Sequence, residues 1–543
     1  MNNSNPPKKQ VFLQSIAMAL GTMTSRVLGL LRDMAFAAMF SRTITDAWGV
    51  AFRIPNLFRR LLGEGSLAVS FIPVFVEARV EDSSLVRSRN LVNSFYTMLL
   101  VILIVLTALG IIFAEPIVRL LVEGNFSEIP GKFELTVRMT RIMFSFIFLM
   151  SNYAFFMGIL NALGQFGLPA MAPTFFNIAM IISNFVPKSW QPVEGDALAW
   201  GVIVGGILQV AILVPSLIKK NYLPKVSRQM WNPDVRRVLL NMLPGMLGTG
   251  LLQITTIINT NFASSLGEGT NTYIFLADRL LELPLSLVAV SLGTALLPTL
   301  SSLWSQGERH RMSETSNFYL RVNMFMAMPA AVGLYVLALP IVELLFQRGR
   351  FTLSDSLVTA SVVRMYAFTL LASSSVRVLV PAYYAVKNTW FPAVVSFICL
   401  VVHVLVAPQL MRVYGIEGLV GSTLISATLN LLFLVFSYRF FINPFGIKLW
   451  LRQLILFLIP SSGLFFIASQ YLWIRSWLGG ILSGGGDSLV VKLASLIVVI
   501  ISGAAVYLSI AYLMKLEECF SALNTVFRKI NRQFSNEYKG LKK

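Results

Sequence analysis

Long apolar stretches follow one another along almost the whole chain, and they decide what it can fold into. About fourteen of them reach the roughly 20 residues that an α-helix needs to cross a bilayer. The 543 residues are 56% hydrophobic and only 13% charged, whereas ordinary soluble domains carry about 25% charged residues. The sequence therefore predicts an all-α polytopic membrane protein. The expected helices cover residues 11–40, 46–78, 91–122, 135–163, 168–187, 196–218, 236–263, 271–304, 316–346, 354–386, 390–411, 415–440, 449–473 and 487–515.

Lysine and arginine residues concentrate in alternate connections between these stretches. They fill the connections at 79–89, 219–237 and 309–311, whereas the connection at 264–271 has none. Because positively charged loops stay in the cytoplasm, these connections and both chain termini are expected to be cytoplasmic. The same distribution accounts for the net charge of +19 without nucleic-acid binding.

An internal repeat divides the chain. PIVRLL at Pro116–Leu121 recurs as PIVELL at Pro340–Leu345, and other matched pairs keep a smoothly changing spacing. Each copy holds six expected helices, an even number, so both copies should share one orientation, related by rotation about the membrane normal. The predicted domains are a six-helix lobe at 1–230, a second at 231–445, two additional helices at 446–515 and a basic amphipathic cytoplasmic tail at 516–543.

Three charged segments interrupt apolar sequence: SRVLGLLRD at 25–33, RIPNLFRRLLGEGS at 53–66 and LADRLLELP at 276–284. A charge at mid-membrane costs about 3 kcal/mol on insertion scales, so these side chains should line a central cavity instead of facing lipid. Arginines outnumber carboxylates there by six to four, which predicts a cationic cavity. The guanidinium fork suits phosphate oxygens and favours an anionic, phosphate-bearing substrate.

Within these segments, four arginines are the candidate substrate-binding residues: Arg26, Arg32, Arg59 and Arg279. The supporting cavity charges are expected at Asp33, Arg53, Arg60, Glu64, Asp278 and Glu282. For Arg53 and Arg60 a scaffold role in pairs with neighbouring carboxylates is the alternative. Asp33 adjoins Arg32 and lies two turns from Arg26, so it can orient an arginine. Three arginines near span ends, by contrast, are expected to extend to the membrane interface: Arg138, Arg141 and Arg321.

Prolines occupy matching places in the two copies. Pro55 and Pro73 lie in the expected helix at 46–78, and Pro284 and Pro298 lie in its mate at 271–304. Both helices should be bent or broken. Kinked helices at matching positions mark the flexing segments of transporters, so these prolines are hinge candidates. The alternative is that they only shape helix packing.

The sequence carries no signature of catalysis. Cys399 and Cys519 match no metal spacing, His310 and His403 are isolated, and no Walker-type or DDxxD-like string occurs. We therefore expect a non-enzyme with no metal or other cofactor. A coupling monovalent cation or the membrane potential is a plausible energy source, because moving one charge across 100 mV is worth about 2.3 kcal/mol.

Four strings point to one family. SRVLGLLRD, TDAWGVAFRIPNLFRRLLGEG, ADRLLELP and LGTALLP resemble the MurJ (MviN) family of lipid II flippases, within the multidrug, oligosaccharidyl-lipid and polysaccharide exporter superfamily. The resemblance covers nearly the whole chain. It implies that lipid II, the undecaprenyl-pyrophosphate-linked precursor of peptidoglycan, moves by alternating access from the inner to the outer leaflet of the bacterial plasma (inner) membrane. Such a protein serves cell wall biogenesis and cell shape.

The same resemblance implies roles for particular residues. The essential cavity arginines of the family fall on Arg26, Arg32, Arg59 and Arg279, and Asp33 and Asp46 are also matched. The two additional helices would border a groove for the lipid tail. The expected partners are lipid II, membrane lipids and other cell-wall synthesis proteins.

Related functions remain open on residues alone. An exporter of another polyprenyl-linked oligosaccharide, of the O-antigen type, or of small amphiphiles would share the fold and the lobes. The charge count favours an anionic substrate, and only the family strings separate lipid II from an O-antigen lipid.

Overall fold

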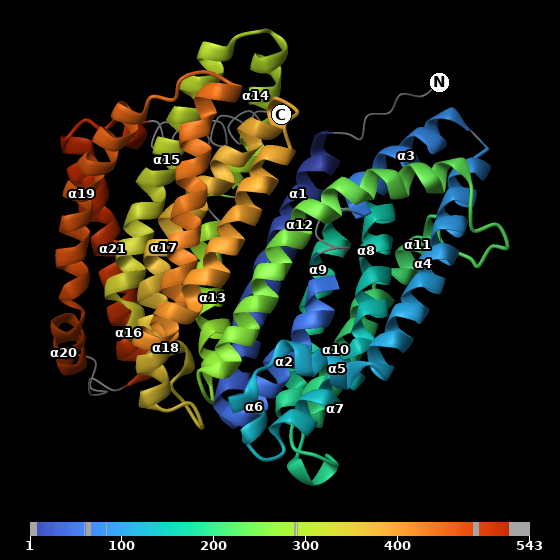
Figure 1. The fold of residues 1–543 in the computed structure, drawn as a ribbon, viewed down its shortest axis with the longest axis horizontal. Helices are drawn as coiled ribbons and strands as arrows, with labels where there is room; N and C mark the ends of the chain where they lie inside the picture. The colour runs from blue at the N-terminus through green and yellow to red at the C-terminus, as the bar shows by residue number, and fades with distance from the viewer. Residues whose placement is uncertain are drawn as a thin grey trace, which may run out of the picture. The chain divides into compact units, whose positions relative to one another are not determined.

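The computed structural model describes residues 8–58, 60, 67–82, 84–286, 289, 291–481 and 488–520, and every regular element in these ranges is a helix (Figure 1). The helices, in chain order, are α1 (Lys8–Met39), α2 (Arg42–Phe58), α3 (Leu67–Glu81), α4 (Val86–Ile112), α5 (Ala114–Leu121), α6 (Gly124–Glu128), α7 (Lys132–Phe144), α8 (Phe146–Ala162), α9 (Gly167–Asn184), the short 3-10 helix η2 (Lys188–Trp190), α10 (Asp196–Ala211), α11 (Val214–Lys219), α12 (Pro233–Ser265), α13 (Thr270–Leu285), α14 (Ser291–Ser305), α15 (Arg309–Val336), α16 (Ala338–Phe346), α17 (Leu353–Ala385), α18 (Trp390–Phe441), α19 (Ile447–Ser469), α20 (Tyr471–Ile481) and α21 (Leu489–Leu513).

The apolar stretches coincide with these helices because a helix satisfies its backbone hydrogen bonds internally, as lipid requires. In the described ranges, seven helices are long and apolar enough to span a membrane, or eight if α15 and α16, bent by 69°, form one span. The all-α polytopic fold class is therefore confirmed, while the total of fourteen spans stays a prediction. The two expected helices at 390–411 and 415–440 form α18, which kinks at Gly415 with φ 56°, a backbone conformation that glycine adopts without steric cost.

The two proline-containing stretches each correspond to a pair of helices. The stretch at 46–78 contains most of α2 and most of α3, and the stretch at 271–304 contains nearly all of α13 and α14. Pro55 and Pro73 lie inside α2 and α3, and Pro284 and Pro298 lie inside α13 and α14. The hinge role of these prolines stays a prediction.

The chain forms two compact units. Unit 1 contains Met1–Thr272 and Arg348–Phe351, and unit 2 contains Tyr273–Gln347 and Thr352–Lys543. Helix α12, which the repeat assigns to the second lobe, thus belongs to unit 1. The domain limits at 1–230, 231–445, 446–515 and 516–543 are drawn from the sequence repeat, and they stay a prediction.

Long-range bonds at both ends of α12 explain its place in unit 1. At its start, Asp234 accepts two bonds from Arg87 of α4, at 2.9 and 2.7 Å. At its end, Ser264 Oγ accepts the Glu123 backbone N–H at 2.8 Å, and Asn125 Nδ2 donates to the Ser265 carbonyl at 2.7 Å.

Aromatic side chains fill the centre of each unit. In unit 1, Phe71 of α3 packs 5.1 Å from Phe155 of α8 and 5.8 Å from Phe95 of α4. In unit 2, Phe325 of α15 packs against Phe457 of α19 and Tyr507 of α21, with ring centroids 5.6 and 5.2 Å apart. The two helices added after the repeat are therefore part of the core of unit 2.

Candidate functional site

The charged segment of α1 is held against α9 by a buried polar network in unit 1. Arg32 donates from Nε and Nη2 to Asp33 Oδ1, at 2.9 and 2.7 Å, and from Nη1 to Asn177 Oδ1 of α9 at 3.1 Å. Asn177 Nδ2 in turn donates to the Ser25 carbonyl at 2.9 Å. Arg32 and Asp33 are both buried, whereas Arg26 is exposed. The network fixes the plane of the Arg32 guanidinium.

This geometry shows which arginine Asp33 holds. The Asp33 carboxylate forms an ion pair with its sequence neighbour Arg32, and both residues belong to α1. The partner on α9, Asn177, was not among the residues selected from the sequence. Its signal was a single amide inside the apolar run PTFFNIAM of residues 173–180, because a polar group in such a run needs a hydrogen-bond partner when it is buried.

Asp46 of α2 has a different environment, although the family resemblance groups it with Asp33. It pairs with Lys132 of α7 at 2.9 Å, and both side chains are 1% exposed. It also accepts the backbone N–H groups of Gly269 and Thr272, at 2.7 and 3.0 Å, and the Thr272 hydroxyl at 2.7 Å. The Lys132 ammonium lies 4.3 Å from the Phe126 ring centroid. These bonds join α2, α7 and the start of α13 within unit 1.

The other candidates of unit 1 are only partly described. Arg53 of α2 and Arg60 are partly buried. Arg59 and Glu64 lie outside the described residues.

The unit 2 candidates lie on α13. Arg279 Nη1 lies 3.4 Å from Glu282 Oε2, one turn along the helix, and both side chains remain substantially exposed. The guanidinium also lies 5.3 Å from the Phe275 ring centroid. Asp278 is partly buried. That the segments of α1, α2 and α13 line one cavity stays a prediction.

One expectation about span ends is wrong. Arg321 of α15 does not extend to the interface: its side chain is 9% exposed and pairs with the fully buried Glu518 at 2.7 Å. The reason is a carboxylate supplied from beyond α21, which no local pattern reveals. Arg138 of α7 differs: it forms a two-point pair with Asp196 of α10, at 2.8 and 2.7 Å, but its side chain stays 46% exposed, so its place at the interface stays a prediction.

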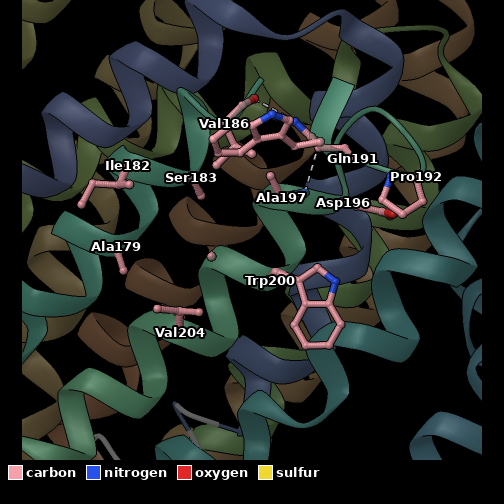
Figure 2. A pocket seen from close by; sticks show the side chains of 12 residues that line it. Ala179, Ile182, Ser183, Val186, Gln191, Pro192, Asp196, Ala197, Trp200 and Val204 are labelled. Atoms are coloured by element: carbon pink, nitrogen blue, oxygen red, sulfur yellow. Dashed lines mark hydrogen bonds between the residues drawn. The ribbon is translucent and has the colours of Figure 1, made fainter. Parts of the chain in front are cut away.

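A shallow, mostly apolar pocket on unit 1 is lined in part by Asp196, the partner of Arg138, and by none of the candidate cavity charges. Figure 2 shows it between α9, α10 and the segment that joins them, with Ile182, Trp200 and Val204 among its lining residues. Gln191 uses its amide locally, accepting from the Ala197 N–H and donating to the Val186 carbonyl. The lining contains no lysine or arginine, so the pocket offers little to an anionic head group. Among the described residues, no cluster of three or more His, Cys, Asp or Glu side chains is arranged for a metal ion.

Comparison with known proteins identifies relatives along most of the chain. The family model described as "Lipid II flippase MurJ" matches residues 34–481, a range that begins directly after Asp33. A protein of Bdellovibrio bacteriovorus named "Probable lipid II flippase MurJ" is 47% identical over 511 residues, covering 94% of this chain and 96% of the relative. A "Lipid II flippase MurJ" of Burkholderia cenocepacia is 36% identical and covers 77% and 82% of the two chains.

Solved structures agree on the fold. The structure titled "Lipid II flippase MurJ, inward closed conformation" superposes with a TM-score of 0.70 at 24% identity, covering 91% of this chain and 98% of the other. An inward-facing multidrug resistance transporter of the MATE family and MOP superfamily superposes with a TM-score of 0.67 at 12% identity, covering 80% and 99%. The family model matches most of this chain, and one relative is 47% identical across nearly all of both sequences. The chain therefore belongs to the MurJ family of lipid II flippases.

Proposed function

We infer that the chain moves lipid II from the inner to the outer leaflet of the membrane by alternating access. Membership of the MurJ family carries this conclusion. The protein is a multi-span transporter and not an enzyme. The physical task is clear, because a pyrophosphate and sugar head group loses its water if it enters hydrocarbon. A polar path between protein surfaces replaces that water.

The arginines of the charged segments are the proposed head-group ligands. Arg26 and Arg279 support this role because both are accessible at the protein surface. Arg32 supports it differently: Asp33 and Asn177 orient its guanidinium before any substrate arrives. Arg59 is proposed on the sequence strings alone. Pyrophosphate oxygens accept two-point bonds from such planar forks, which a lysine cannot offer.

The remaining assignments complete the proposal. Asp33 and Asp46 act as scaffold carboxylates, supported by their buried bonds to Arg32 and Lys132. The location is the bacterial inner membrane with both termini in the cytoplasm, supported by the lysine and arginine distribution. A monovalent ion gradient or the membrane potential biases the cycle. Because lipid II is made on one side and used on the other, other cell-wall synthesis proteins are the expected partners.

The decisive experiment measures which leaflet holds lipid II. Labelled lipid II in cells depleted of this protein should accumulate in the inner leaflet, and a plasmid copy should restore outer-leaflet labelling. An unchanged distribution, in cells shown to lack a second flippase, would contradict the function. An O-antigen-type substrate would instead appear as normal lipid II distribution with retention of the other polyprenyl lipid.

A further inference from the structure

Residues 219–236, which run from the end of α11 through the connector into the start of α12, form an ordered strip along α4 in unit 1. The backbone N–H groups of Lys225 and Ser227 donate to Asn93 Oδ1 and Thr97 Oγ1 of α4, each at 2.8 Å. Earlier in the connector, Tyr222 is buried, with its hydroxyl 3.0 Å from Ser88 Oγ. The backbone of this strip therefore faces the protein at fixed points, and other side chains of the strip are turned outward.

The strip carries positive charge that the protein does not neutralise. Five exposed cationic side chains of the strip have no ion pair or side-chain hydrogen bond to the residues that the structure describes: Lys219, Lys220, Lys225, Arg228 and Arg236. The carboxylates at the neighbouring helix ends are already used, because Asp234 and Glu81 pair with Arg87, and Glu77 pairs with Arg237.

Exposed apolar side chains lie between these cations. Val226 is 75% exposed, Trp231 is 60% exposed and Met230 is 43% exposed. The strip runs beside α4, a helix apolar enough to span the membrane. Tryptophan combined with lysine and arginine at the end of a span is typical of the membrane interface, where an aromatic ring sits among head groups.

We propose that this strip, residues 219–236, binds anionic phospholipid head groups, with Trp231 and Val226 inserted beside their glycerol and upper acyl carbons. Charge complementarity favours this occupant, since five unneutralised cations attract anionic lipid over a zwitterionic one. A contrasting loop lies between α9 and α10: Trp190 is 79% exposed there, but Lys188 is neutralised by Glu194 at 2.7 Å. That loop should touch lipid without selecting charge.

The test uses the full chain in lipid nanodiscs that contain brominated phosphatidylglycerol or brominated phosphatidylcholine, because bromine quenches tryptophan fluorescence on contact. The chain has nine tryptophans, so the Trp231 signal is the difference between wild type and Trp231→Phe. Phosphatidylglycerol should quench that signal at a lower mole fraction than phosphatidylcholine does. The Trp190 signal, from Trp190→Phe, should respond equally to both lipids.

Charge removal completes the test. Lys225→Ala and Arg228→Ala should each weaken the apparent affinity for phosphatidylglycerol about fivefold, without changing the melting temperature, because neither side chain has a protein partner in the described part. Equal quenching of Trp231 by the two lipids, or an unchanged preference in a variant that combines Lys225→Ala with Arg228→Ala, would overturn the proposal. No quenching by either lipid would place the strip in water and overturn it as well.

Discussion

At the scale of single residues, the charged segments contain exposed arginines and one arginine, Arg32, that is held in a buried pair. Arg26 and Arg279 are accessible, whereas Arg32 is fixed by Asp33 and Asn177. A buried guanidinium fixed by two partners meets an incoming anion without first losing rotamer freedom. The two kinds of arginine therefore predict different results when they are changed.

Alanine at an accessible arginine should affect transport more than stability. Arg26→Ala or Arg279→Ala each removes a charge-assisted contact worth about 1.5–3 kcal/mol to an anionic head group, and lysine should restore activity only in part. Outer-leaflet lipid II measures the effect. The control is Arg119→Ala, since Arg119 is exposed and its ion pair is with Glu115 in the same short helix. Full transport by both alanine variants would remove these arginines from the site.

Asn177 offers a test of orientation. Asn177→Ala leaves Arg32 in place but removes its second acceptor and the bond to Ser25, so lipid II binding should weaken. Asn184→Ala is the matched control, because Asn184 is equally buried in α9 but bonds only the Met180 carbonyl one turn away. If the two variants lose stability alike and neither loses lipid II binding, Asn177 does not position Arg32.

The Asp33 carboxylate should behave as scaffold. Asp33→Asn leaves the buried Arg32 charge without its counter-ion, and breaking such a pair costs about 3–5 kcal/mol. We expect lower membrane abundance and a lower melting temperature. The double variant Arg32→Gln with Asp33→Asn should regain part of that stability but not transport. A stable single variant that binds lipid II more tightly and releases it slowly would indicate a role in substrate release instead.

Sequence reasoning reached only part of this site. It placed Arg32 beside Asp33 because the two are neighbours in the chain, and local spacing is visible in a sequence. It did not identify Asn177, which lies 145 residues away, because a hydrogen-bond partner across helices leaves no periodic pattern. The same limit applies to Glu518, which changes Arg321 from an interface residue into a buried one.

At the scale of helices, hydropathy predicted most helix bounds closely. It did not predict the long-range hydrogen bonds at the helix ends. The expected stretch at 354–386 is α17, Leu353–Ala385, and the stretch at 236–263 lies within α12. Hydropathy indicates which segments enter lipid, but it does not indicate which other helices each segment packs against. Helix α12 joins unit 1 through residues outside its apolar run, such as Asp234 and Ser264.

The stabilisation that the Asp234–Arg87 pair gives at the start of α12 should depend on pH only under acidic conditions. The Arg87 guanidinium lowers the pKa of Asp234 below its ordinary value. A lowered pKa in the folded state means that the pair stabilises the protein fully above the unfolded pKa near 4 and loses that stabilisation as pH falls through the folded pKa. Asp234→Asn should therefore lower the melting temperature by a constant amount between about pH 5 and 8.

The gap between the two melting curves should then close below about pH 4. Glu115→Gln is the control, because its exposed pair with Arg119 lies within α5 and contributes little. A difference that grows as the pH falls would have the wrong sign for a lowered pKa and would contradict the assignment.

At the scale of the whole chain, the polypeptide passes between the two units at the peptide bonds 272–273, 347–348 and 351–352. At the crossings 272–273 and 351–352, side chains form hydrogen bonds within their own units. Thr272 bonds Asp46 in unit 1. In unit 2, Tyr273 and Thr352 both donate to Asp355, whose side chain is buried, at 2.5 and 2.7 Å. One carboxylate thus fixes the unit 2 side of two crossings that lie far apart in the sequence.

Alternating access requires motion between units, so residues at the crossings should matter for transport beyond their contribution to stability. Thr272→Val and Tyr273→Phe each remove one hydroxyl while keeping side-chain shape, and Asp46 and Asp355 retain other donors. Each change should destabilise the fold by about 1 kcal/mol yet slow lipid II transport in vesicles several-fold. The matched control is Tyr438→Phe, which removes a buried hydroxyl bond to Ser316 inside unit 2. If Tyr438→Phe slows transport as much as the crossing variants do at an equal melting temperature, stability governs the transport rate and the crossings have no special role. If Thr272→Val and Tyr273→Phe transport lipid II normally, the bonds at these two residues serve only the fold.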